Sequence, residues 1–187
     1  MELTHTSIPP DELAVFKLLT DINVIVDVGA RDDTEYIKLH LNCEFHAFEP
    51  NPVFFEQLKT KIGDRPKTYL NNWGLSDVVD KLPYNNARQA FVGGEEISVK
   101  EGQQQLPLST LDEYVREKGI ERIDFLKIDT EGYDFKVLLG ATETIPKCKH
   151  IQYEYWNDRV RFHSLLEERF FMSYIGGRNV LCTNKTW

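Results

Sequence analysis

Four acidic residues end or follow short apolar runs of this chain, and their type and spacing make them the strongest candidates for chemistry. They are Asp27, Glu49, Asp129 and Glu131. Continuous apolar runs are typical of parallel strands buried on both faces, and an open α/β sheet binds its ligand beyond the carboxyl ends of such strands. We therefore expect these carboxylates to gather at one edge of a sheet, in a pocket that suits a cationic or hydroxyl-rich ligand.

The loop after the first run argues against a cofactor that carries phosphate. A dinucleotide-binding loop has the pattern G-x-G-x-x-G, which lets a pyrophosphate approach the start of a helix. Only Gly29 is present here, and Asp32 and Asp33 stand where the pyrophosphate would lie. NAD, FAD and ATP are therefore disfavoured, and so is a nicotinamide-dependent dehydrogenase. S-adenosylmethionine fits better, because it is cationic and lacks phosphate, and Glu49 follows Asp27 at about the 20-residue spacing expected of a partner for ribose hydroxyls.

The elements that must position these residues alternate along the chain, which predicts an α/β fold. We expect strands at residues 23–28, 45–48, 68–70, 124–128 and 151–155, and helices at 13–19, 34–41, 52–62, 109–118, 134–140 and 160–169. Two further strands, 171–175 and 179–183, flank a Gly-Gly-Arg turn and form a hairpin. This order predicts a mainly parallel sheet with one antiparallel strand near its edge.

Residues 80–108 differ in composition from the rest, with two adjacent glycines and a run of three glutamines. Short β-like pieces at 81–84 and 97–99 indicate an exposed hairpin or insertion. We place acceptor specificity in the segment 85–105.

Length, charge and cysteines limit the classes of protein. A chain of 187 residues is expected to form a single domain over 1–187, either alone or as part of a larger enzyme. The net charge of −8 argues against sequence-independent binding to nucleic acid. No apolar run approaches the roughly 18 residues of a membrane-spanning helix. The odd cysteines Cys43, Cys148 and Cys182 lack metal-binding spacing, which favours a reduced, cytoplasmic protein.

Six segments of the chain resemble the FkbM-type methyltransferases. They are residues 27–30, 48–52, 74–77, 108–112, 124–132 and 137–141. The resemblance implies the Rossmann-like class I methyltransferase fold with a seven-stranded sheet and dependence on S-adenosylmethionine. It also implies methylation of a hydroxyl oxygen of a sugar or a polyketide. The cofactor-binding positions that follow from it are Asp27, Gly29, Ala30, Arg31, Glu49, Asn51, Leu75, Ser76, Asp77 and Asp129.

Methyl transfer is an in-line displacement that depends mainly on positioning, and an alcohol acceptor also benefits from a general base. The candidate catalytic carboxylates are Asp129, Glu131 and Glu154. They are also the candidate ligands of a divalent metal, although a metal is not favoured. His163 is a weaker candidate base, because a solvent-exposed position without a catalytic role is the better interpretation of this residue. Lys127 is expected to support the acidic cluster, and Tyr155 and Trp156 lie where a sugar ring could stack.

The leading interpretation is an O-methyltransferase that acts on a sugar, a glycan or a similar polyhydroxylated small molecule, without a nucleic-acid or membrane partner. A methyltransferase for an amine or a protein side chain is the alternative enzyme. A non-catalytic cofactor-binding module is the alternative of a different class. Acceptor identity and oligomeric state stay open at this point.

Overall fold

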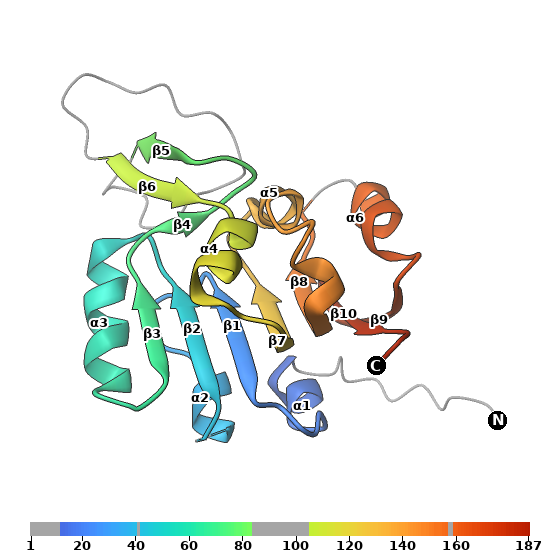
Figure 1. Ribbon diagram of the computed structural model, residues 1–187, viewed down its shortest axis with the longest axis horizontal. Coiled ribbons are helices and arrows are strands. Elements are labelled where there is room, and N and C mark those ends of the chain that lie inside the picture. Colours follow the sequence, from blue (N-terminus) through green and yellow to red (C-terminus); the bar gives the residue numbers. More distant parts are fainter. Residues whose placement is uncertain (1–11, 41, 84–104, 157–158) are drawn as a thin grey trace.

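The computed structural model describes residues 12–40, 42–83, 105–156 and 159–187. Most of the segment 85–105 and the expected strand piece at 97–99 lie outside the described residues. The larger sheet has seven strands in the order β3-β2-β1-β7-β8-β10-β9 (Figure 1). Its strands are β1 (Val24–Val28), β2 (Glu44–Phe48), β3 (Thr68–Asn71), β7 (Ile123–Ile128), β8 (Cys148–Glu154), β9 (Phe170–Gly176) and β10 (Asn179–Asn184).

Strand directions confirm the sequence prediction. The pairs β1–β2, β1–β7, β2–β3 and β7–β8 are parallel, whereas β10 is antiparallel to both β8 and β9. The predicted Rossmann-like α/β fold is therefore the observed one. The carboxyl ends of β1, β2 and β7 meet at one edge, and so do the acidic residues that follow these strands.

Helices cover both faces of this sheet (Figure 1). They are α1 (Glu12–Phe16), α2 (Tyr36–Leu39), α3 (Pro52–Ile62), α4 (Leu111–Lys118), α5 (Asp134–Leu139), α6 (Arg159–Leu166) and the short 3₁₀ helix η1 (Ile145–Lys147). Strand alternation divides the core accordingly. Val26 and Leu126 pack in one cluster with residues of α4, α5 and α6, and Ile25 and Phe125 pack in the other with residues of α1, α2 and α3.

Most helices are shorter than predicted, and for α1 and α2 the reason is local. Beyond Phe16 the hydrogen bonds change to a three-residue spacing, from Leu18 to Val15 and from Leu19 to Phe16, so α1 becomes a tight turn. The amide of Thr34 donates to the side chain of Asp33 at 2.9 Å, which delays the start of α2. The chain leaves α6 at Leu166 and turns into β9.

Asn51 and Gly63 delimit α3 as the sequence indicates. The side-chain oxygen of Asn51 accepts hydrogen bonds from the amides of Val53 and Phe54 at 2.9 and 3.4 Å, and Gly63 ends the helix with a φ of 66°. Asn51, which was expected at the cofactor, therefore has a structural task as an N-cap.

A second, three-stranded sheet lies beyond the carboxyl ends of the large one (Figure 1). Its strands are β4 (Gly74–Leu75), β5 (Asp80–Pro83) and β6 (Gln105–Ser109). The strand piece predicted at 81–84 is observed as β5, which pairs antiparallel with β6, whereas β6 itself and its parallel pairing with β4 were not expected. None of the helices in the described ranges is long and apolar enough to cross a bilayer.

Candidate active site

Gly29 brings the end of β1 against the ends of both neighbouring strands. The amides of Gly29 and Ala30 donate to the carbonyl oxygen of Phe48 at 2.9 and 3.1 Å. Gly29 has a φ of 83°, and a Cβ atom there would lie 1.9 Å from the carbonyl oxygen of Asp129. Only glycine fits this turn. Ala30 itself is buried in the core below the turn.

The carboxylate of Glu49 is fixed by two backbone amides. Its Oε2 atom accepts from the amide of Arg31 at 2.9 Å, and its Oε1 atom accepts from the amide of Asn51 at 2.7 Å. Burial raises the pKa of Glu49 above its ordinary value, and the two amides oppose that shift. The Arg31 side chain points outward and lies over the ring of Phe54. Glu49 is thus a rigid acceptor at the end of β2.

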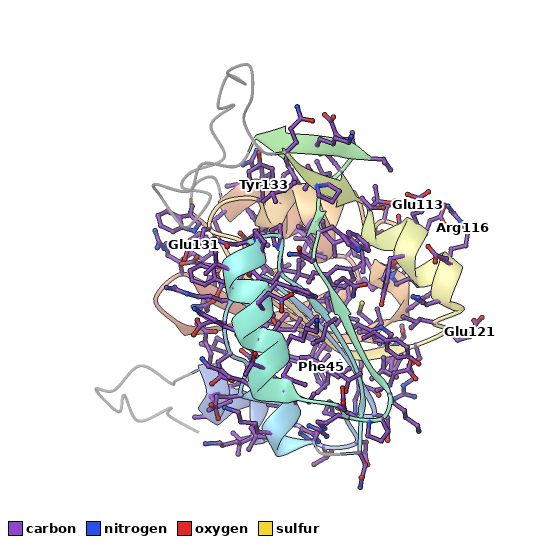
Figure 2. All side chains as sticks on the ribbon, turned by 90° about the vertical axis from the view of Figure 1, so that its left-hand side faces the viewer. Phe45, Glu113, Arg116, Glu121, Glu131 and Tyr133 are labelled. Carbon is purple, nitrogen blue, oxygen red and sulfur yellow. The ribbon has the colours of Figure 1, made fainter. Side chains whose placement is uncertain are left out.

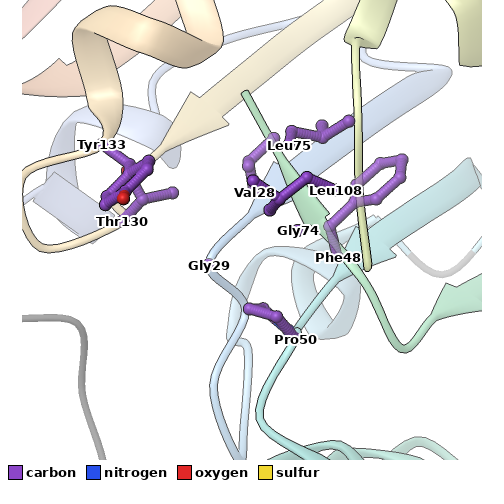
Figure 3. A pocket seen from close by; sticks show the side chains of 9 residues that line it. All are labelled: Val28, Gly29, Phe48, Pro50, Gly74, Leu75, Leu108, Thr130 and Tyr133. Carbon is purple, nitrogen blue, oxygen red and sulfur yellow. The ribbon is translucent and has the colours of Figure 1, made fainter. Parts of the chain in front are cut away.

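A narrow apolar pocket of about 30 Å³ opens beside Glu49, between the two sheets (Figure 3). Its lining residues are Val28, Gly29, Phe48, Pro50, Gly74, Leu75, Leu108, Thr130 and Tyr133. Leu75 is the one of the three expected adenine neighbours that lines it. A pocket of this width and chemistry takes the edge of a flat ring rather than a whole ligand.

Ser76 and Asp77, the other two expected neighbours, do not line this pocket. The amide of Ser76 donates to the carbonyl oxygen of Ser109, and its hydroxyl donates to Asp77 at 2.9 Å. Its carbonyl oxygen is packed against Gly140, where a Cβ atom would lie 1.9 Å away. Ser76 therefore joins β4 to the turn after α5, and Asp77 is exposed.

Lys127 lies between two of the predicted site carboxylates. Its Nζ atom is 3.5 Å from Oδ1 of Asp27 and 3.4 Å from Oδ2 of Asp129. Burial acts to lower the pKa of Lys127, but the charges of Asp27 and Asp129 outweigh it and raise that pKa. The lysine is therefore a fixed cation, and the predicted supporting role agrees with this geometry.

Asp27 is fully buried, and neither of its carboxylate oxygens has a hydrogen bond among the described residues. The ion pair with Lys127 is the contact that offsets its charge. Asp129, by contrast, keeps 37% of its side chain exposed. The edge of the sheet thus presents one exposed carboxylate above a buried ion pair.

A polar row continues from this ion pair across the sheet. Gln152, which pairs in register with Lys127, donates to Glu12 at 2.7 Å and to the hydroxyl of Tyr36 at 3.3 Å. Asn179 donates to the other carboxylate oxygen of Glu12 at 2.6 Å. These bonds connect α1 and α2 to the floor of the site.

Glu131 follows Asp129 in a loop beside α5 (Figure 2). Its backbone has a φ of 56°, which is uncommon for a residue with a side chain. Burial raises the pKa of Glu131, and the charges of Asp129 and Glu154 raise it further, while Arg31 and Arg178 act in the opposite direction. The charges of the other two predicted catalytic carboxylates therefore both reach Glu131.

Glu154 is engaged by two donors. Its Oε2 atom accepts from Nε1 of Trp156 at 2.7 Å, and its Oε1 atom accepts from Nε of Arg178 at 3.1 Å. The guanidinium of Arg178 also lies 3.6 Å from the centre of the Trp156 ring. The side chains of Glu154, Trp156 and Arg178 form a closed unit, called here the Trp156 unit.

Asp134 holds the loop that carries Glu131. Its Oδ2 atom accepts from the hydroxyl of Thr130 at 3.0 Å and from the amide of Gly132 at 3.2 Å. Burial raises the pKa of Asp134 to about 6. Sequence reasoning missed this residue, although an acidic residue in the first turn of a helix is a known signal for such a role.

Two weaker candidates of the sequence analysis were His163 as a base and a divalent-metal site. The Nε2 atom of His163 lies 2.6 Å from the hydroxyl of Tyr174 in an exposed pair, so it is partnered rather than free. Within the described part of the chain, no three histidine, cysteine or acidic side chains converge as metal ligands would. Cys43, Cys148 and Cys182 are free thiols, and all are buried.

The family model described as the methyltransferase FkbM domain matches residues 27–176, which include every strand end described above except the end of β10. The chain belongs to the FkbM methyltransferase family. The resemblance seen in the sequence motifs is therefore confirmed.

Two curated relatives of this FkbM chain are methyltransferases by name. It is 26% identical to the 2-O-methyltransferase NoeI of Sinorhizobium fredii, over 71% of this chain and 63% of the relative. It is also 26% identical to the hexuronic acid methyltransferase AglP of Haloferax volcanii, over 69% of this chain and 54% of the relative. The chain thus spans between about half and two thirds of the length of these relatives.

Solved structures support the fold. A methyltransferase FkbM from Methylobacillus flagellatus has a TM-score of 0.63 at 14% identity, over 89% of this chain and 45% of that one. TrmK of M. capricolum, in complex with S-adenosylhomocysteine, has a TM-score of 0.51 at 14% identity, over 92% of this chain and 66% of that one. At this identity the likeness concerns the fold alone.

The residues at this edge of the FkbM chain fit S-adenosylmethionine. Glu49 offers fixed carboxylate oxygens to hydroxyls, the apolar pocket accepts the edge of a flat ring, and Asp129 faces solvent with a negative charge. The sequence did not single out Arg178, Tyr133 or Asp134. Arg178 gave no signal because it contacts Glu154 only after the chain has folded back through α6 and β9.

Proposed function

We propose that this chain uses S-adenosylmethionine to methylate a hydroxyl of a sugar, a glycan or a similar polyhydroxylated small molecule. The observation that carries the proposal is the Glu49 carboxylate, which two backbone amides fix beside an apolar pocket at the Gly29 turn. The names of the two relatives in the family, a 2-O-methyltransferase and a hexuronic acid methyltransferase, support a sugar hydroxyl as the acceptor.

When bound, the cofactor supplies a methyl group on a positively charged sulfur. The chain's own residues then have three tasks. Glu49 accepts the ribose hydroxyls, since both its oxygens are already oriented. Leu75, Phe48 and their neighbours shelter the adenine. The exposed carboxylate of Asp129 favours the cationic methionine end, and Lys127 pairs with both carboxylates and offsets the buried charge of Asp27.

Glu131 is the best placed general base among the three candidates. No hydrogen bond or ion pair engages its carboxylate within the described residues. Burial and the neighbouring carboxylates raise its pKa, which makes it a better proton acceptor than an ordinary glutamate. Asp129 is ion-paired with Lys127, and Glu154 is hydrogen-bonded at both oxygens, so each is less available.

The test is calorimetric titration of the chain with S-adenosylhomocysteine, on the wild type, Glu49→Gln and Glu49→Ala. We expect binding by the wild type and at least a tenfold loss with either substitution, which corresponds to about 1.4 kcal/mol. Glu56→Ala is the matched control, because Glu56 is an exposed glutamate on α3 whose contact is an ion pair with Lys59 at 3.8 Å. No binding by the folded wild type would refute the proposal.

The acceptor is tested next, with radiolabelled S-adenosylmethionine and a panel of methyl glycosides, hexuronic acids, amines and peptides. Label in a glycoside or a hexuronic acid is the expected result. Label in an amine or a peptide instead would replace the sugar with the alternative acceptor. Cofactor binding without transfer to any class would favour a non-catalytic binding module.

A further inference from the structure

The Trp156 unit has a geometry that simple packing does not require. Trp156 is 36% exposed, yet its orientation is fixed by a 2.7 Å hydrogen bond to Glu154 and by the Arg178 guanidinium 3.6 Å from the ring centre. The amide of Tyr155 also donates to the carbonyl oxygen of Arg178, which ties the two chain segments together. An exposed indole that two partners hold in one orientation is a preorganised contact surface.

The Trp156 unit lies at the edge of the sheet where the acidic strand ends meet. Ile128 of β7 pairs with Tyr153 of β8, so Asp129 and Glu154 leave their strands side by side. The charges of Glu154 and Arg178 both act on Glu131, which is the proposed base. Trp156 therefore lies next to the place where the hydroxyl of the acceptor must lose its proton.

Glu154 is poorly suited to accept that proton. Both oxygens already accept hydrogen bonds from donors that are held in place, and a proton would displace one of them. The same two bonds are what fixes the indole. The contacts of Glu154 thus fit a positioning residue rather than a catalytic one.

We infer that the ring of the acceptor sugar stacks on the face of Trp156 that Arg178 leaves uncovered, with Glu154 and Arg178 as positioning residues for the indole. This inference rests on the proposed function. A pyranose ring has an apolar face of C–H groups, which packs against the electron-rich face of an aromatic ring. The remaining N–H groups of Arg178 are donors for sugar hydroxyls at the same level.

The chain contains a matched control. Trp187 is 44% exposed and also has an arginine over its ring, with the guanidinium of Arg122 at 4.1 Å from the ring centre. Arg122 precedes β7, however, so this second pair belongs to the opposite edge of the sheet. Trp187→Ala removes a similar tryptophan without touching the proposed acceptor site.

The experiment is saturation-transfer NMR on the S-adenosylhomocysteine-bound protein, with methyl β-glucopyranoside and methyl β-glucuronide as probes. We expect transfer to the ring C–H protons in the wild type and in Trp187→Ala, at least a fivefold loss in Trp156→Ala, and partial recovery in Trp156→Phe. Calorimetry on the same samples should show unchanged affinity for S-adenosylhomocysteine, which confirms that each variant is folded.

The outcomes separate the two proposals. If the wild type does not bind S-adenosylhomocysteine, the proposed function fails. If it binds, but neither probe gives a signal or Trp156→Ala equals Trp187→Ala, only the stacking inference fails. Glu154→Gln adds a second readout. If Glu154 is a positioning residue, the variant should have a raised KM for the acceptor and a kcat within about tenfold of the wild-type value. If Glu154 is instead the general base, kcat should fall by about 10²–10⁴-fold, which would overturn the positioning role.

Discussion

Gly29 and Asp129 are in backbone contact, because a Cβ atom on Gly29 would lie 1.9 Å from the carbonyl oxygen of Asp129. The two residues come from neighbouring strands, and each was predicted at the cofactor. Their contact fixes the distance between the Gly29 turn and the acidic end of β7. The geometry of the site therefore depends on a hydrogen atom in place of a side chain.

Gly29→Ala is expected to lower the free energy of unfolding by about 2–5 kcal/mol, through a left-handed backbone and a steric clash. It should also abolish binding of S-adenosylhomocysteine. Gly119→Ala is the control, since Gly119 has a φ of 67° but open space around it, and should lower stability by only about 1 kcal/mol. Thermal unfolding and calorimetry measure both effects, and equal losses in the two variants would contradict the steric explanation.

Lys127→Met is expected to lower the free energy of unfolding by about 3–5 kcal/mol, because it leaves the buried charge of Asp27 without its counter-charge. The double variant Asp27→Asn with Lys127→Met should recover much of this loss, since it removes both charges together. Urea unfolding of the single and double variants gives the comparison. Additive losses in the double variant would show that the ion pair is not the cause.

Asp134→Asn tests the raised pKa of the loop-holding carboxylate. In the wild type a pKa raised from 3.8 to about 6 means that the folded state binds the proton more tightly, so stability falls as the pH rises from about 4 through 6. Asparagine has no such titration. The stability of the variant relative to the wild type should therefore increase between pH 4 and pH 7, by roughly 2 kcal/mol. A difference that does not change with pH would contradict the shift.

Glu131→Gln is expected to lower kcat by about 10²–10⁴-fold while leaving the affinity for S-adenosylhomocysteine unchanged. In the wild type, activity should be lost as the pH falls through the pKa of Glu131, and this acid limb should lie above the ordinary glutamate value of 4.5. A pH–rate profile of kcat/KM measures the limb. Its persistence in the glutamine variant would assign the base to another residue.

Removal of divalent metals with EDTA is expected to leave the rate of methyl transfer unchanged. The reason lies in the candidate ligands, since Asp129 is paired with Lys127 and Glu154 with Arg178 and Trp156. A dialysed sample assayed with and without added Mg²⁺ gives the answer. A rate that returns only with Mg²⁺ would mean that these pairs break during turnover.

The sheet could be predicted because its signals are local. Buried parallel strands leave apolar runs, and Gly29 and Glu49 stand at spacings that a strand–turn–helix unit dictates. The Gly-Gly-Arg turn predicted the terminal hairpin for the same reason. Helix ends were less predictable, since the side chain of Asp33 decides the start of α2 by competing for a backbone amide.

The roles of individual side chains depended on contacts that no spacing reveals. Ser76 matches the family motif, yet it holds β4 against Gly140 rather than lining the pocket. Glu154 was selected as a carboxylate at a strand end, but its partner Arg178 is reached only through the folded hairpin. The parallel pairing of β4 with β6 likewise brings together segments on either side of residues 84–104.

The reversed direction of β10 has a consequence for how this site can diversify. Because β10 runs against its neighbours, the turn from β9 to β10 lies at the same edge as the acidic strand ends, and Arg178 is delivered there by a hairpin. The Gly29 turn lies on the far side of β7 and β8 from it. Substitutions in this short connection are therefore expected to change the surface beside the proposed base without altering the proposed cofactor site, so that the binding of acceptor and cofactor could evolve separately.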